Sequence, residues 1–260
     1  MHILDKIYHY KKQEVALRKK QTSIEELKQK IFFSRTCFSI EAALKNSSSK
    51  IIAEFKRKSP SKANINLDAK VSEVVPAYEK AGAAGISVLT DEHFFGGSLE
   101  FLFEARNAVN VPLLQKDFIV DPYQIYEAKA YGADFILLIA AVLSMQEIQQ
   151  FSTLAQELGL EVLVEVHDEE ELQKVFFTSI NLIGVNNRNL KTFEVDIAKS
   201  KELMHQIPSE FVKITESGID SIESFRFLKE AGFEGFLMGE KFMKEQQPGQ
   251  ALENFIQQVS

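Results

Sequence analysis

The chain has 260 residues, of which 45% are hydrophobic and 26% are charged, a composition typical of a globular protein long enough to bury one sizeable core. Its formal net charge of −7 argues against a nucleic-acid partner, which needs a basic surface, but allows a small anionic substrate in a locally basic pocket. No apolar run approaches the roughly 18 residues of a membrane span, so we expect no membrane partner.

The first 48 residues are predicted to form a helical N-terminal extension. Apolar residues recur there at roughly helical spacing, and Ser23 followed three residues later by Glu26 resembles a capping box that opens a second helix. This section is too poor in apolar residues to build a core of its own. We therefore expect a single domain over residues 1–260, with the extension in 1–48 and the main body in 49–260.

The N-terminal section also bears on the cellular compartment. Its one cysteine, Cys37, is the only one in the chain, which excludes an internal disulfide and suits a reducing environment. The first residues hold no apolar stretch long enough for a signal peptide. A cytoplasmic location is the expectation.

From residue 50 onward, short apolar runs rich in β-branched residues alternate with stretches of helical periodicity. The expected strands cover residues 51–55, 86–89, 111–114, 135–139, 160–166, 182–185, 212–215 and 235–238. The expected helices include 74–81, 122–131, 145–158, 197–205 and 222–231, and several end at a glycine stop: Gly82, Gly132, Gly159 and Gly232. The strands recur about every 26 residues, the length of one βα unit. Eight such units predict an α/β fold, a (β/α)₈ TIM barrel with a helical N-terminal extension.

Polar residues at the strand ends are the informative breaks in this pattern. Parallel strands are covered on both faces and should be almost wholly apolar, and catalytic groups of TIM barrels lie at the C-terminal strand ends. Six strands carry candidates there: Glu54, Lys56, Lys116, Glu165, Asn186, Arg188, Glu216, Ser217, Gly218 and Gly239. Because buried charge is costly unless it is paired, three carboxylates opposite three cations predict a polar cluster at the barrel mouth.

Two glycine turns predict a phosphate site. Ser217 and Gly218 follow the seventh strand, and Gly239 and Glu240 follow the eighth. Glycine lets backbone N–H groups approach an anion, and phosphate sites of these barrels often form from the loops after strands seven and eight. The expected partner is therefore a phosphorylated small molecule.

Eight segments of the chain match a known family: IIAEFKRKSPSK (51–62), FFGGSLEFL (94–102), PLLQKDFIVDPYQI (112–125), GADFILLI (132–139), EVLVEVHD (161–168), IGVNNRNL (183–190), ITESGI (214–219) and FLMGEKFM (236–243). Taken together, they resemble the indole-3-glycerol-phosphate synthase family, carboxy-lyases of tryptophan biosynthesis. They cover essentially the whole predicted barrel. The resemblance implies ring closure, decarboxylation and dehydration of 1-(2-carboxyphenylamino)-1-deoxyribulose 5-phosphate to indole-3-glycerol phosphate, with no cofactor and no metal.

The resemblance also implies residue roles. Lys116 is the general acid that protonates the sugar carbonyl, and Glu165 is the acid–base group of the dehydration. From the neighbouring cations Lys56 and Arg188 we expect the pKa of Lys116 to be lowered. The other implied catalytic residues are Lys56, Glu54, Asn186 and Glu216. The implied substrate-binding residues are Ser59 and Arg188 for the carboxylate, Ser217, Gly218, Gly239 and Glu240 for the phosphate, and Phe94, Phe118 and Leu137 for the aromatic ring.

Three alternatives stay open at this point. They are phosphoribosylanthranilate isomerase, a Schiff-base aldolase using Lys116, and a barrel that binds a sugar phosphate without turnover. The single cysteine lies in the extension, which argues against a Cys/Asp isomerase pair. Ala63 stands where the family usually has glycine, which predicts a stiffer loop after the first strand, and Phe55 is a harmless departure. We expect a monomer or a weak homodimer.

Overall fold

The predicted TIM barrel is confirmed. A computed structural model describes residues 3–176, 180–189 and 194–259. Within these residues, eight parallel strands pair in sequence order and close on themselves. The strands are β1 (Ile51–Phe55), β2 (Gly85–Leu89), β3 (Leu113–Lys116), β4 (Phe135–Ile139), β5 (Glu161–Val166), β6 (Leu182–Asn186), β7 (Val212–Glu216) and β8 (Gly235–Met238). Leu190, the last residue of the predicted segment 183–190, lies outside the described residues.

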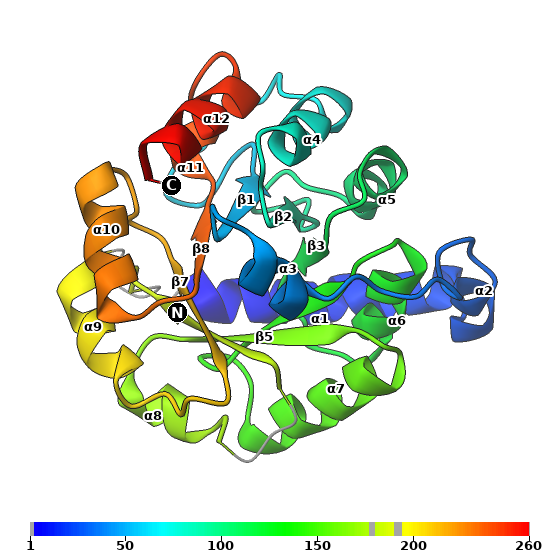
Figure 1. Cartoon of the computed structure of the whole chain (residues 1–260). Coiled ribbons are helices and arrows are strands. Elements are labelled where there is room, and N and C mark those ends of the chain that lie inside the picture. The colour runs from blue at the N-terminus through cyan, green and yellow to red at the C-terminus, as the bar shows by residue number, and fades with distance from the viewer. Residues whose placement is uncertain (1–2, 177–179, 190–193, 260) are drawn as a thin grey trace.

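Helices follow the strands and form the outer layer of the barrel (Figure 1). They are α4 (Val71–Lys80), α5 (Leu99–Ala108), α6 (Tyr123–Ala130), α7 (Met145–Glu157), α8 (Glu169–Gln173), α9 (Ile197–Met204), α10 (Ile222–Ala231), α11 (Glu240–Met243) and α12 (Pro248–Val259). Each predicted glycine stop has a positive φ, between +75° and +111°, which ends the preceding helix in the left-handed region that glycine tolerates.

Alternation along the strands separates two apolar layers. Side chains such as Val162 and Val164 point outward and pack against the helices, whereas Leu163 points into the barrel. On β5, the next inward position after Leu163 is Glu165. The same step leads from Leu114 to Lys116 on β3. The functional side chains are therefore the top layer of the barrel interior, directly above an apolar layer that excludes water.

The N-terminal extension contains α1 (Ile3–Gln21), α2 (Ile24–Lys28) and α3 (Ile40–Asn46), and it reaches both ends of the barrel. Figure 1 shows α3 in front of the strands and α1 passing behind them. The predicted capping box at Ser23 is present. Ile40 and Leu44 of α3 are buried where β2 and β8 begin, close to Gly85 and Gly235. The extension therefore covers the N-terminal end of the barrel with α3.

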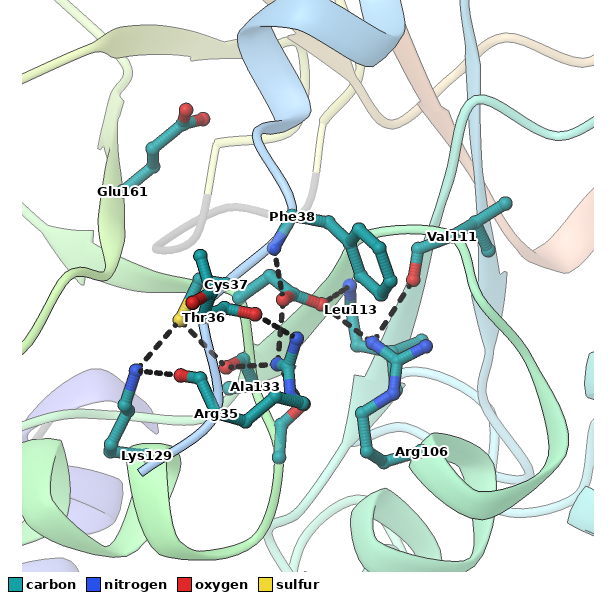
Figure 2. Close-up of polar contacts among 12 residues, drawn as sticks. Arg35, Thr36, Cys37, Phe38, Arg106, Val111, Leu113, Lys129, Ala133 and Glu161 are labelled. Carbon is teal, nitrogen blue, oxygen red and sulfur yellow. Dashed lines mark hydrogen bonds and ion pairs between the residues drawn. The ribbon is translucent and has the colours of Figure 1, made fainter. Parts of the chain in front are cut away.

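A buried carboxylate ties the extension to the N-terminal end of the barrel (Figure 2). Asp134, just before β4, accepts hydrogen bonds from Arg35 Nη2 at 2.6 Å and from the Phe38 amide at 2.7 Å. It also accepts from Arg106 Nη1 of α5 at 2.7 Å and from the Leu113 amide at 2.8 Å. Asp134 is fully buried, so one carboxylate satisfies donors from three separate segments.

Candidate active site

The predicted site residues converge on one cavity of about 360 Å³ at the C-terminal end of the barrel. Its lining includes residues from the ends of β1, β3, β5, β6, β7 and β8. The predicted residues found in the lining are Glu54, Lys56, Ser59, Lys116, Phe118, Leu137, Glu165, Asn186, Arg188, Glu216, Ser217, Gly218, Gly239 and Glu240. Among the predicted residues, all of which the structure describes, Phe94 alone is outside this lining, and its neighbour Phe95 is part of it.

Lys116 lies at the centre of a group of carboxylates. Its Nζ is 2.6 Å from Glu216 Oε2, and it lies 3.8 Å from Glu54 Oε2 and 3.9 Å from Glu165 Oε2. These three acids come from β7, β1 and β5, so the strand ends of three separate units meet at one ammonium group. A fourth ion pair joins Lys56 Nζ to Glu54 Oε1 at 2.5 Å.

The expectation of a lowered pKa for Lys116 is wrong. Burial by itself lowers the pKa of this ammonium, but Glu216, Glu54 and Glu165 outweigh burial and hold the pKa above its ordinary value. The expectation considered the cations Lys56 and Arg188, whereas the closest charges in three dimensions are carboxylates. Lys116 is therefore a protonated donor throughout the neutral range.

Glu165 has the opposite perturbation. Burial and, next, the charge of Glu216 raise the pKa of Glu165 to about 8, while Lys116 and a hydrogen bond from Asn186 act in the lowering direction. Asn186 Nδ2 donates to Glu165 Oε1 at 2.9 Å. The Asn186 side chain is fixed in turn, because its Oδ1 accepts from the Arg188 amide at 2.9 Å. Glu165 can thus gain or lose a proton close to neutral pH, as a general acid–base group requires.

Glu54 stays ionised beside two ammonium groups. Burial raises the pKa of its carboxyl, but Lys56 and Lys116 outweigh burial and lower the pKa below its ordinary value. Glu54 also closely faces Gly239, where an added Cβ would lie 2.8 Å from the Glu54 Cβ. The sequence needs glycine at 239 because the end of β8 passes directly over this side chain.

The two turns predicted for phosphate lie side by side at the ends of β7 and β8, which pair in register. Ser217 and Gly218 both have φ of +68°, a left-handed conformation that turns the backbone sharply after Glu216. Asn187 Nδ2 holds this turn by donating to the Ser217 carbonyl at 2.6 Å. Sequence reasoning missed Asn187, although it stands in the same run of polar residues at the end of β6.

The loop after β1 closes one side of the cavity. Ser59 and Lys62 exchange backbone hydrogen bonds of 2.8 and 3.0 Å, which form a tight turn. Lys62 then forms an ion pair with Glu240, at the start of α11. Burial raises the pKa of Glu240, but Lys62 outweighs burial and lowers it. The loop that carries Ser59 is therefore held against the turn after β8.

Another part of the cavity wall is apolar. Phe118 and Leu137, both predicted to contact the aromatic ring, line it together with Phe95. Phe94 instead packs edge-on to Tyr10 and stays outside the lining. A second apolar group comes from the N-terminal extension: Ile3, Leu4 and Ile7 of α1. This set was not predicted, because helical periodicity does not say which part of the barrel a helix covers.

Two features are absent from the described residues. No cluster of three or more His, Cys, Asp or Glu side chains in residues 3–176, 180–189 and 194–259 is arranged to hold a metal ion. Over the same ranges, none of the helices is both long and apolar enough to cross a membrane.

Comparisons with known proteins identify the family. The family model described as indole-3-glycerol phosphate synthase matches residues 4–255. Indole-3-glycerol phosphate synthase of Bacteroides thetaiotaomicron is 49% identical over 99% of this chain and 98% of its own, and that of Campylobacter jejuni subsp. doylei is 44% identical over 98% and 100%. In fold alone, the α subunit of tryptophan synthase from Legionella pneumophila is similar, with a TM-score of 0.63 at 15% identity over 85% of this chain and 97% of that one. The chain belongs to the indole-3-glycerol phosphate synthase family.

Proposed function

We propose that this cavity closes the indole ring of 1-(2-carboxyphenylamino)-1-deoxyribulose 5-phosphate to give indole-3-glycerol phosphate, carbon dioxide and water. The observation that carries the assignment of roles is that Lys116, an ammonium group in the resting enzyme, and the titratable Glu165 lie in one cavity, 3.9 Å apart. The lyase activity and its place in tryptophan biosynthesis follow from the family.

In the first step, the ring carbon that bears the carboxylate bonds to the sugar carbonyl carbon. The carbonyl oxygen becomes an alkoxide, which is a stronger base than an amine and takes the proton of Lys116. The carbon–carbon bond to the carboxylate then breaks, and its electron pair restores the aromatic ring as carbon dioxide leaves. Carbon dioxide leaves without releasing a proton. Lys116 therefore takes back from solvent the proton that it gave to the alkoxide. Glu216, Glu54 and Glu165 stabilise the ammonium form that is restored.

In the last step, the new hydroxyl leaves as water. Protonated Glu165 gives the hydroxyl a proton and takes one back from the neighbouring ring carbon, so the carboxyl group ends as it began. Glu54 and Asn186 hold the hydroxyl and amine region, and Lys56 lies against the carbonyl or the phosphate.

The remaining residues are assigned to binding. Ser217, Gly218, Gly239 and the amide of Glu240 hold the phosphate, and Ser59 and Arg188 hold the carboxylate. Phe118 and Leu137 contact the aromatic ring, and Phe95 replaces Phe94 in that set because it lines the cavity. We further propose a single domain, a monomer or weak homodimer, and a cytoplasmic location, which gel filtration and cell fractionation test.

Fluorescence of the indole product formed from the carboxyphenylamino substrate tests the proposal. K116M and E165Q are each expected to lower kcat by at least about a hundredfold, the usual contribution of a general acid–base group. E161Q is the matched control, because Glu161 lies on the same strand as Glu165 at the opposite end of the barrel. Near-normal turnover in K116M and E165Q would remove both roles. Borohydride reduction with substrate is expected to trap no adduct; a covalent adduct on Lys116 would favour the aldolase alternative.

A further inference from the structure

A second lysine is buried at the barrel mouth, outside the reacting centre. Lys11 projects from α1 and is fully buried together with the two aspartates that it contacts. Its Nζ lies 2.7 Å from Asp91 Oδ2 and 3.0 Å from Asp117 Oδ1, and 2.9 Å from Glu14 Oε2 on its own helix. Burial lowers the pKa of Lys11, but Asp117, Asp91 and Glu14 outweigh burial and hold it above its ordinary value. The side chain is therefore a buried ammonium with three acidic partners.

The two aspartates belong to the strand ends that carry the site. Asp117 directly follows Lys116, and its Oδ2 accepts a hydrogen bond of 2.6 Å from Thr90 at the end of β2. Asp117 Oδ1 also accepts from the Phe118 amide at 2.8 Å, so this carboxylate shapes the backbone on the C-terminal side of Lys116.

Asp91 organises the neighbouring loop. Its Oδ1 accepts from the amides of Phe94 and Phe95 at 2.7 and 3.1 Å, which turns the chain so that Phe95 faces the cavity. Lys11 contacts the second oxygen of the same carboxylate. One ammonium therefore joins the loop after β2, the loop after β3 and α1.

We propose that Lys11 is a positioning residue for catalysis: it fixes the end of β3, and thereby the Nζ of Lys116, relative to the ring-binding loop after β2. This inference rests on the acid role proposed for Lys116. Two buried aspartates without their cation would repel each other or turn toward solvent, and either change displaces the peptide next to Lys116.

If Lys11 only held α1 on the barrel, its replacement would loosen the helix; if Lys11 positions Lys116, its replacement would lower kcat. Leu4, Ile7 and Val15 already bury the apolar face of α1, so the docking of the helix does not depend on Lys11 alone. Among the residues that the structure describes, no hydrogen bond or ion pair joins Lys11, Asp91 or Asp117 to the phosphate turns after β7 and β8. Misplacement of Lys116 should therefore lower kcat and leave KM, to which the phosphate contributes, nearly unchanged.

The test compares K11M with K19M. Lys19 is on the same helix and also pairs with an aspartate of the barrel, Asp121 at 2.7 Å, but this pair is partly exposed. K11M is expected to lower kcat by at least about tenfold with KM within about threefold of wild type, and K19M to change neither, because small misplacements of a reacting group are costly. A kcat of K11M within about twofold of wild type, or a loss confined to KM, overturns the proposal.

A double-mutant cycle with D117N tests the path of the effect. If Lys11 acts through Asp117, D117N lowers kcat less in the K11M background than in wild type, whereas additive losses overturn the proposal. If K11M does not fold, D117N alone tests the inference. D117N is expected to fold, because Lys11 keeps Asp91 and Glu14 as partners. An unchanged kcat in D117N overturns the inference. K116M distinguishes a failure of the acid role of Lys116 from a failure of the positioning role of Lys11. If K116M is active, the acid role fails; if K116M is inactive and K11M is normal, only the role of Lys11 fails.

Discussion

Replacing Glu216 by glutamine is expected to move the pH dependence of the reaction to lower pH. Glu165 must be protonated to give its proton to the leaving hydroxyl, so kcat/KM of the wild-type enzyme should fall as pH rises through about 8. The charge of Glu216 is one of the two main causes of that raised pKa, the other being burial. Removing this charge lowers the pKa of Glu165, and the fall in kcat/KM then begins at lower pH.

The size of the change follows from the geometry. The nearest oxygens of Glu216 and Glu165 lie 2.6 and 3.9 Å from Lys116 Nζ, so they are at most 6.5 Å apart, the sum of these distances. Two charges at that separation repel each other by about 2 to 3 kcal/mol at an effective dielectric constant of about 20. That energy corresponds to a pKa lower by about 1.5 to 2, which places the fall near pH 6 to 6.5.

The assay is the fluorescence of the indole product, with kcat/KM measured between about pH 5 and 10 for wild type, E216Q and the control E161Q. Glu161 lies at the other end of β5, where its Oε2 accepts from the Ile40 amide at 3.0 Å, so E161Q should keep the wild-type profile. A profile of E216Q that coincides with wild type, or moves to higher pH, would refute the assignment of this limb to Glu165.

Other variants test neighbouring features. N186A removes a hydrogen bond that favours ionised Glu165, so the same limb of the kcat/KM profile should move to higher pH. G239A places a methyl group 2.8 Å from Glu54 Oε1, and a raised KM with intact folding is expected; unchanged KM would exclude a tight turn over Glu54. D134N should lower the free energy of unfolding by about 3 to 5 kcal/mol in urea, whereas the partly exposed D121N should lower it by less than about 1 kcal/mol.

The strand-end residues could be predicted from the sequence because a strand has a fixed period of two. Once Leu163 and Leu114 are placed inside the barrel, Glu165 and Lys116 must point inward one layer higher. The same period points Glu54 and Glu216 inward, and closure of the barrel brings the ends of their strands together, so these distant residues could be expected to meet.

Features that depend on loops and on distance could not be predicted in this way. The choice of Phe95 over Phe94 depends on hydrogen bonds to Asp91 in a loop that has no period. The pKa of Lys116 depends on which charges lie closest in space, and the expectation based on the cations Lys56 and Arg188 gave the wrong sign. The place of α1 at the mouth, where Lys11 contacts Asp91, could not be predicted because helical periodicity does not say which part of the barrel a helix covers.

The extension that reaches both ends of the barrel imposes an order on folding during synthesis. Arg35 is separated by 99 residues from Asp134, and Ile40 by 121 from Glu161, so the leading segment leaves the ribosome long before its docking partners exist. Its apolar side chains, including Leu44 beside Gly235, have no closed barrel to cover until β8 has been made. Contacts of such long range form late and slow folding. A segment that is translated before the barrel is thus expected to be among the last to reach its final place.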